Sequence, residues 1–257
     1  MAPIVVAAGS LALMTCAALV GMALRTALPK HHESAALNDT VTRTLALVVT
    51  LTSVVLGFMV GSAKGYYDNV QDKLTRVAAD TMMLDRMLVR YGPEAGEARE
   101  LLRQIAGSAV RVMWPGHATQ LPALAAGRPI DGLDRLESAI RAFPVRDEEQ
   151  RSLQSGALQR TGDIAQAVSL LVTATQTRIQ TPIIAILALW LVIIFLGFGL
   201  LAPRNGSAVA VLLMSALAAS WAIFLIQELY SPLGGLIKIP PSTLEFSLDE
   251  GIARRTQ

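Results

Sequence analysis

Cysteine is almost absent from this sequence: Cys16 is the only one in 257 residues, and it lies inside an apolar run. One thiol excludes a disulfide framework or a cysteine-based zinc site built from a single chain. Basic clusters are scarce too, since no tract is longer than Arg254-Arg255 and the net charge is only +2. The sequence therefore does not predict a nucleic-acid partner.

Charge is missing from four long apolar runs. Hydrophobic residues make up 53% of the chain and charged residues 16%, which is too apolar for an ordinary soluble domain. A helix needs roughly 20 residues to cross a bilayer, and residues 3–24, 44–63, 182–202 and 207–229 have this length. Within them the only Asp, Glu, Lys or Arg is Glu228, at the last edge. We expect four transmembrane helices.

The first apolar run has an alternative interpretation as a cleavable signal peptide. No basic residue precedes it, its length exceeds the usual run of about 7–15 residues, and Pro29 follows closely. We therefore expect residues 3–24 to be a retained span.

Residues 64–181 carry many charges of both signs and no apolar run of span length, so they are predicted to form a soluble domain. One set of mostly apolar residues recurs every three or four positions and so lies on one face of a helix: Tyr67, Val70, Leu74, Val77, Thr81, Leu84, Leu88 and Tyr91. This stripe indicates a long helix that ends at Gly92-Pro93. No strand pattern of useful length competes. The prediction is an all-α membrane protein with two transmembrane hairpins, residues 1–63 and 182–230, around this domain, and a tail over 231–257.

Reactive constellations are absent from the sequence. It contains no P-loop, no Gly-x-Ser-x-Gly motif and no His-Glu-x-x-His motif. His31 and His32 are adjacent, so they cannot share one helical face as paired metal ligands, and His117 stands apart. The spans also lack the mid-membrane carboxylate or histidine typical of proton-driven transport. We expect no enzyme, no catalytic residue, no metal site and no cofactor.

The second span carries the features of most interest. Gly57, Gly61 and Gly65 are four residues apart, which predicts a helix-packing face. Another face presents three apolar residues, which in an oligomer would form an apolar, water-excluding pore constriction: Leu51, Val55 and Phe58. Simple contact with lipid or another helix is the alternative. If the register is off by one residue, the pore-facing set becomes Thr52, Leu56 and Met59.

The order of the segments resembles that of the bestrophins. The runs "VVLGFMVGSAKGYYDNV", "MLDRMLVRYGPEAGEARELLR", "LALWLVIIFLGFGLLAPRN" and "FLIQELYSPLGGLIKI" are similar to an uncharacterised bacterial family labelled bestrophin-like, over nearly the whole chain. Bestrophins are pentameric ion channels whose second span lines the pore with an apolar neck. The resemblance thus implies a pentameric passive channel. It leaves the sign of the ion open, with anions such as chloride as one expectation, and places the neck at Leu51, Val55 and Phe58.

The sequence departs from eukaryotic bestrophins in two places. Their acidic calcium-binding cluster after the last span is replaced by scattered acids, so we expect no calcium gate: Glu245, Asp249 and Glu250. Their paired tryptophans after the second span are replaced by Tyr66-Tyr67.

Glu228 ends the last apolar run, where a carboxylate can reach headgroup water. It is predicted either to mark that boundary or to form an ion pair with Lys64 or Arg178. Basic residues near span ends are more numerous on the side of the soluble domain, which favours a cytoplasmic domain, cytoplasmic termini and a bacterial inner-membrane location.

Two functions follow as alternatives. One is a passive ion channel, with the lipid bilayer, other copies of the chain and small inorganic ions as its partners. The other is a non-conducting membrane scaffold or sensor whose soluble domain binds a partner. The oligomeric state distinguishes them, because a monomer or dimer leaves no central pore.

Overall fold

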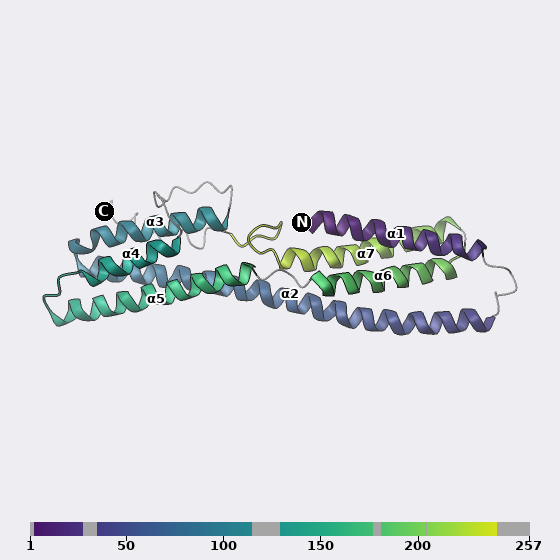
Figure 1. The fold of residues 1–257 in the computed structure, drawn as a ribbon, viewed down its shortest axis with the longest axis horizontal. Coiled ribbons are helices and arrows are strands. Elements are labelled where there is room, and N and C mark those ends of the chain that lie inside the picture. The colour runs from purple at the N-terminus through teal and green to yellow at the C-terminus, as the bar shows by residue number, and fades with distance from the viewer. Residues whose placement is uncertain (1–2, 28–34, 115–128, 177–180, 204, 241–257) are drawn as a thin grey trace. The chain divides into compact units, whose positions relative to one another are not determined.

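The computed structural model describes residues 3–27, 35–114, 129–176, 181–203 and 205–240 (Figure 1). These residues form helices and no strand, which confirms the predicted all-α fold. In chain order the elements are α1 (Pro3–Ala27), α2 (Ala35–Tyr91), the 3-10 helix η2 (Pro93–Ala95), α3 (Gly96–Met113), α4 (Pro129–Arg141), α5 (Glu148–Gln176), α6 (Thr181–Leu201) and α7 (Gly206–Leu229).

The chain divides into two compact units. The membrane unit comprises residues 1–67 and 178–237, and the helical domain comprises residues 68–177 and 238–257. The boundary between them falls inside α2, so this 57-residue helix contributes its first part to the membrane unit and its second part to the helical domain.

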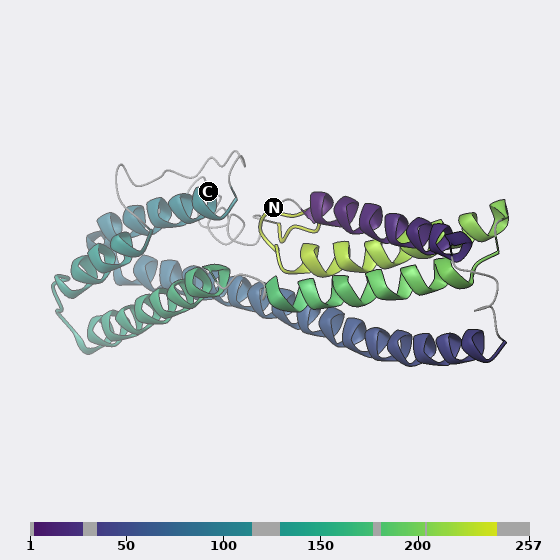
Figure 2. The same cartoon turned by 45° about the vertical axis from the view of Figure 1, so that its right-hand side comes forward.

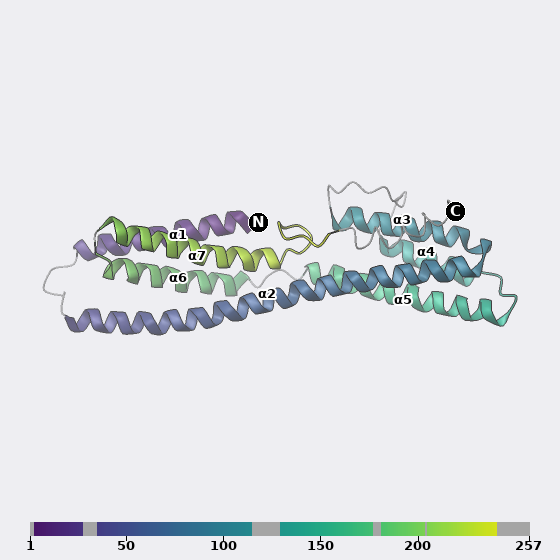
Figure 3. The same ribbon diagram turned by 180° about the vertical axis from the view of Figure 1, so that it is seen from behind.

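The membrane unit contains the predicted spans. Three helices are long and apolar enough to cross a bilayer: Pro3–Arg25, Gly206–Leu229 and the apolar part of Asp39–Tyr91. The fourth predicted span is α6, whose 21 residues extend over roughly 31 Å at 1.5 Å per residue and whose described apolar stretch is Ala185–Leu201. Figure 3 shows α1, α6 and α7 alongside the first part of α2.

Two glycines allow α1 and α6 to touch at the level of their backbones. A Cβ on Gly21 would overlap the carbonyl oxygen of Leu196, and a Cβ on Gly199 would overlap that of Ala18. Small residues at a helix crossing permit this close approach, which strengthens van der Waals packing where lipid supplies no hydrophobic driving force. The principal partners of α1 are thus α6 and α7, rather than the next helix in the sequence.

Polar contacts reinforce the packing of α1. The Ser220 hydroxyl of α7 donates to the Ala7 carbonyl at 2.7 Å. Where α6 ends, Nη1 of Arg25 donates to the carbonyls of Leu201 at 3.2 Å and Ala202 at 2.7 Å. A cation at this position satisfies the last carbonyl groups of α6 and is attracted by the negative end of the helix dipole.

The helical domain surrounds the second part of α2 with α3, α4 and α5 (Figure 2). The predicted stripe on α2 is buried from Val70 to Tyr91, as are Leu102 and Ile105 of α3, whereas Val112 of α3 is exposed. Among the described residues, two partly buried ion pairs tie α2 to its neighbours: Arg99 Nε lies 2.9 Å from Asp85, and Arg160 Nη1 lies 2.8 Å from Asp80.

The second part of α2 ends as predicted, at Tyr91 before Gly92-Pro93. Gly92 has φ 121°, a conformation that favours glycine. The hydroxyl of Tyr91 donates to the Pro144 carbonyl at 2.8 Å. Burial raises the pKa of Tyr91, Glu94 and Asp147 act in the same direction, and Arg146 opposes them. The phenol therefore stays protonated and able to donate this hydrogen bond.

The backbone contact between α1 and α6 yields a matched prediction. Gly21→Ala forces a methyl group into the Leu196 carbonyl, and overpacking of this kind costs about 1–3 kcal/mol. The same substitution at Gly9, also on α1, meets nothing within 4 Å. We expect G21A to lower the melting temperature of the detergent-solubilised protein while G9A leaves it within error. Equal melting of the two variants would contradict this packing.

Candidate functional site

The first part of α2 packs against its own chain along one narrow seam. Its side chains buried in the membrane unit recur at steps of seven and four: Leu45, Thr52, Met59 and Ala63. Met59 and Ala63 belong to the apolar core formed with α1, α6 and α7. One such seam occupies a limited part of the circumference of a helix. The rest of this membrane helix is left for contacts outside the chain.

The predicted pore residues lie to one side of this seam. Leu51 is 52% exposed and Phe58 is 77% exposed, whereas Val55 is half-buried against the core. The one-residue alternative faces inward, since Thr52 is only 3% exposed and Met59 only 8%. The exposed set is therefore better placed than the alternative set to meet anything outside the chain.

Val54 was not among the predicted pore residues, yet it is 67% exposed. At 3.6 residues per turn it lies about 160° around the helix from Thr52, whereas Val55 lies only about 60° away. Thr50, Val54 and Phe58 thus form an exposed row at steps of four. Thr52 is the polar residue of the seam, and it identifies the inward side of the helix only once its burial is known. No signal in the sequence therefore distinguished Val54 from Val55.

The hydroxyl groups of this segment are satisfied within the helix. Thr50, Thr52 and Ser53 donate to the carbonyls four residues earlier, at 2.9, 2.7 and 2.8 Å. This back-bonding turns the hydroxyl hydrogens toward the backbone. The exposed face therefore presents mainly methyl groups and the ring of Phe58.

Gly57, Gly61 and Gly65 also point away from the chain. A Cβ on any of them would meet nothing within 4 Å. In the described part of the chain, Gly21 and Gly199 bring α1 and α6 together, and Gly197 of α6 lies against the side chain of Leu45 on α2. Packing on the Gly57–Gly61–Gly65 face stays a prediction, and no described residue of this chain packs there.

Aromatic residues connect α2 with α7 where both approach the predicted end of the membrane. The rings of Tyr66 and Tyr230 lie 5.3 Å apart between centroids and are tilted by 38°. The hydroxyls of Ser62 and Tyr230 are 3.4 Å apart, a long contact. Nζ of Lys64 lies 5.8 Å from the centroid of the Tyr67 ring. Aromatic and basic side chains of this kind are typical of the interface between membrane and water.

Glu228 is buried at the end of α7, with 1% of its surface exposed. Its Oε1 accepts a hydrogen bond from the backbone N–H of Ile237 at 2.8 Å. The predicted partner Arg178 lies outside the described residues, and the pairing with Lys64 or Arg178 stays a prediction. What the structure adds is a partner that the sequence did not indicate, the backbone of the chain that follows.

The chain after Glu228 folds into a tight turn, here called the exit turn (residues 230–237). Ser231 N–H donates to the Glu228 carbonyl at 2.9 Å, and the N–H groups of Gly234 and Gly235 donate to the Ser231 carbonyl at 3.2 and 3.0 Å. A Cβ on Gly235 would lie only 2.7 Å from the carboxyl carbon of Glu228. Glycine at this position lets the backbone pass against the carboxylate.

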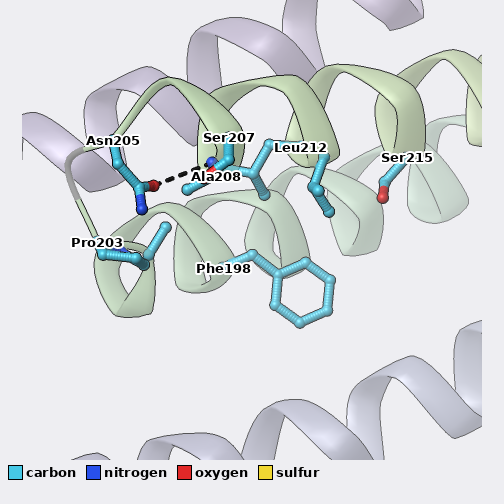
Figure 4. A pocket seen from close by; sticks show the side chains of 9 residues that line it. Phe198, Pro203, Asn205, Ser207, Ala208, Leu212 and Ser215 are labelled. Atoms are coloured by element: carbon cyan, nitrogen blue, oxygen red, sulfur yellow. Dashed lines mark hydrogen bonds between the residues drawn. The ribbon is translucent and has the colours of Figure 1, made fainter.

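A shallow groove of about 540 Å³ lies where α6 turns into α7 (Figure 4). Phe198, Val211 and Leu212 give it mainly apolar walls. Oδ1 of Asn205 accepts from the N–H of Ala208 at 3.0 Å and so caps α7. None of the described residues that line the groove is ionisable. The groove therefore does not gather reactive groups.

Metal ligands do not converge in the described part of the chain, where no group of three or more His, Cys, Asp or Glu residues could hold an ion. His31, His32 and His117 lie outside the described residues, as do Glu245, Asp249 and Glu250. Cys16 is a free, exposed thiol on α1.

These features define a helical membrane protein in which the first part of α2 is largely uncovered by the described part of its own chain. The bestrophin-like domain family matches residues 12–244. The chain belongs to this family, whose members are known as ion channels, and this confirms the resemblance seen in the sequence.

Solved structures with the same fold come from a bacterial bestrophin homologue of Klebsiella pneumoniae. One single-substitution variant of it is 15% identical, with a TM-score of 0.72 over 99% of each chain. Two further variants are 14% and 13% identical, with TM-scores of 0.71 and 0.69 over 96% of this chain and 98% of theirs. At these identities the likeness concerns the fold. The curated proteins contain no match to this chain.

Proposed function

We propose that this protein is a passive ion channel, formed by an oligomer of about five copies around a pore lined by α2. The observation that carries the proposal is the uncovered side of α2: Leu51, Val54 and Phe58 are large apolar side chains, more than half exposed, on a helix whose opposite seam is buried. Membership of the bestrophin-like family supports a channel over other uses of such a face.

The neck would be an apolar constriction. In the proposed oligomer, Phe58 and Leu51 of each copy point toward the axis, and Val55 stands behind them against the core. Val54 lies toward the glycine face, because Gly61, seven residues later, is only about 20° around the helix from it. Methyl and phenyl groups at a narrow point oppose hydration, so the pathway closes by excluding water and needs no charged gate. We propose no catalytic role and no calcium gate for this chain, and we place its domain and termini in the cytoplasm at a bacterial inner membrane.

The glycine face would serve the contact between copies. A pore-lining helix in a ring needs one face toward the axis and others toward its neighbours. Gly57, Gly61 and Gly65 carry no side chain that would keep a neighbouring helix away, and nothing from their own chain covers them. These two roles together would use the part of α2 that the chain itself leaves open.

Conductance of the purified protein in a planar bilayer tests the pore. We expect ion currents, and a several-fold rise in single-channel conductance on Phe58→Ala or Leu51→Ala, because a wider and less apolar neck admits water more readily. Leu217→Ala, on an exposed position of α7, is the matched control and should behave as wild type. Ion-substitution experiments then give the sign of the permeant ion.

Silence across both anions and cations would contradict the channel. A native mass of one or two copies, rather than about five times 27.4 kDa, would do the same and favour a membrane scaffold or sensor whose domain binds a partner.

Association between copies gives a second prediction. Gly61→Leu should reduce the oligomer population in native mass spectrometry, because a large side chain on the proposed contact face keeps helices apart. The melting temperature of the chain itself should change little, since the position is open within the chain. Gly206→Leu, at an equally open position on α7, is the control. An intact oligomer in the Gly61 variant would remove the glycine face from the interface.

A further inference from the structure

We propose that Glu228, Gly235 and Tyr230 are positioning residues for the pore helix: they hold the exit turn closed and so fix the place of the domain-side end of the α2 span. This inference rests on the proposed function, because it concerns the helix that would line the pore. It requires no metal ion and no second chain. All of the contacts that carry it lie within the membrane unit.

The first observation is the burial of Glu228. A carboxylate on the last turn of a helix faces the negative end of the helix dipole, and burial of its charge is unfavourable unless hydrogen bonds satisfy it. Glu228 is nevertheless 1% exposed, and its Oε1 receives the Ile237 N–H at 2.8 Å. The carboxylate therefore fastens Ile237 to the end of α7.

The second observation is the set of backbone hydrogen bonds that close the exit turn. The N–H groups of Tyr230, Ser231, Gly234 and Gly235 all donate to carbonyls of residues 226–231. Glu228 adds the bond that returns the chain at Ile237, and the backbone of Gly235 lies against its carboxyl group. The exit turn is thus a closed structure, and the Glu228 side chain is the part that one substitution can remove.

The third observation connects this turn to α2. Tyr230 is the first residue of the turn, and its ring packs against Tyr66 while its hydroxyl lies near Ser62. Ala63, between them on α2, is fully buried in the core to which Tyr67 and Tyr230 also pack. The first part of α2 contacts the membrane unit through the seam and through the contact between Tyr66 and Tyr230. A shift of Tyr230 removes the second contact, so the domain-side end of the α2 span can tilt. The turn therefore sets where α2 ends, and through the rigid helix it influences the width at Phe58.

The glycine pair of the turn provides the sharpest test. Gly235→Ala places a methyl group on the Glu228 carboxylate and displaces it from Ile237, without any change on α2. Gly234→Ala adds the same methyl group one residue earlier, where nothing lies within 4 Å. Glu228→Ala removes the acceptor, whereas Glu228→Gln keeps a carbonyl oxygen for the Ile237 N–H. Tyr230→Phe keeps the ring contact and loses only the long hydroxyl contact.

Two readouts are needed. The first is single-channel conductance in planar bilayers. The second is the distance between spin labels at Ser53→Cys on α2 and Leu217→Cys on α7, in a Cys16→Ser background with labelled copies diluted among unlabelled ones. Both label positions are exposed, and both belong to the membrane unit. This distance reports the place of α2 whether or not the protein conducts.

We expect G235A and E228A to shift or broaden the distance between labels and to change conductance several-fold in the same direction. G234A, E228Q and Y230F should match wild type in both readouts. Recovery in E228Q separates the positioning role from a general loss of stability and from an effect of charge. A shifted distance in a protein that never conducts would keep this inference and overturn the channel. An unchanged distance in G235A and E228A would overturn the inference even if the protein conducts.

Discussion

The arrangement of α2 depends on how little of it the chain itself covers. In hydrocarbon every backbone N–H and C=O must be paired within its own segment, which a long helix achieves without neighbours. Side-chain packing is therefore free to be sparse, and Leu45, Thr52, Met59 and Ala63 form a seam that leaves most of the helix open. In lipid, apolar side chains gain no hydrophobic free energy when one helix packs on another, so close van der Waals contact has to stabilise the packing. Gly21 and Gly199 supply such contact by bringing the backbones of α1 and α6 together.

Different interactions stabilise the helical domain and the membrane unit. The helical domain buries Val70, Leu84 and Leu136 away from water, so hydrophobic burial drives its packing. It also uses the partly buried ion pairs Asp85–Arg99 and Asp80–Arg160, which specify which helices meet. The membrane unit has to rely on close packing and on a few hydrogen bonds, such as Ser220 to Ala7. Because α2 takes part in both units, its apolar pattern differs between its two parts.

Much of the fold was predictable because its signals are local. Apolar runs of span length, the stripe that ends at Gly92-Pro93 and the absence of strand patterns predicted the helices and their order. The candidate site was predictable only in part. Phe58 and Leu51 are exposed, as is Val54, which was not among the predicted pore residues, and Val55 leans on the core; a pore lined by them stays a prediction. Periodicity shows that a helix has faces without showing which one meets its neighbours. Glu228 was expected either to mark the membrane boundary or to pair with a base, and the structure adds a hydrogen bond from a backbone amide nine residues later, while the ion pair stays a prediction.

The sequence by itself determined that this is a helical membrane protein, because hydropathy and helical periodicity are properties of short segments. Its membership of the bestrophin-like family comes from the match of residues 12–244 to that family. The tertiary structure decided which glycines pack, which side of α2 is buried and what the carboxylate of Glu228 holds. These depend on contacts between residues far apart in the chain. Gly57 and Gly199 look equally suited to packing in the sequence, and only the position of α1 next to α6 distinguishes them.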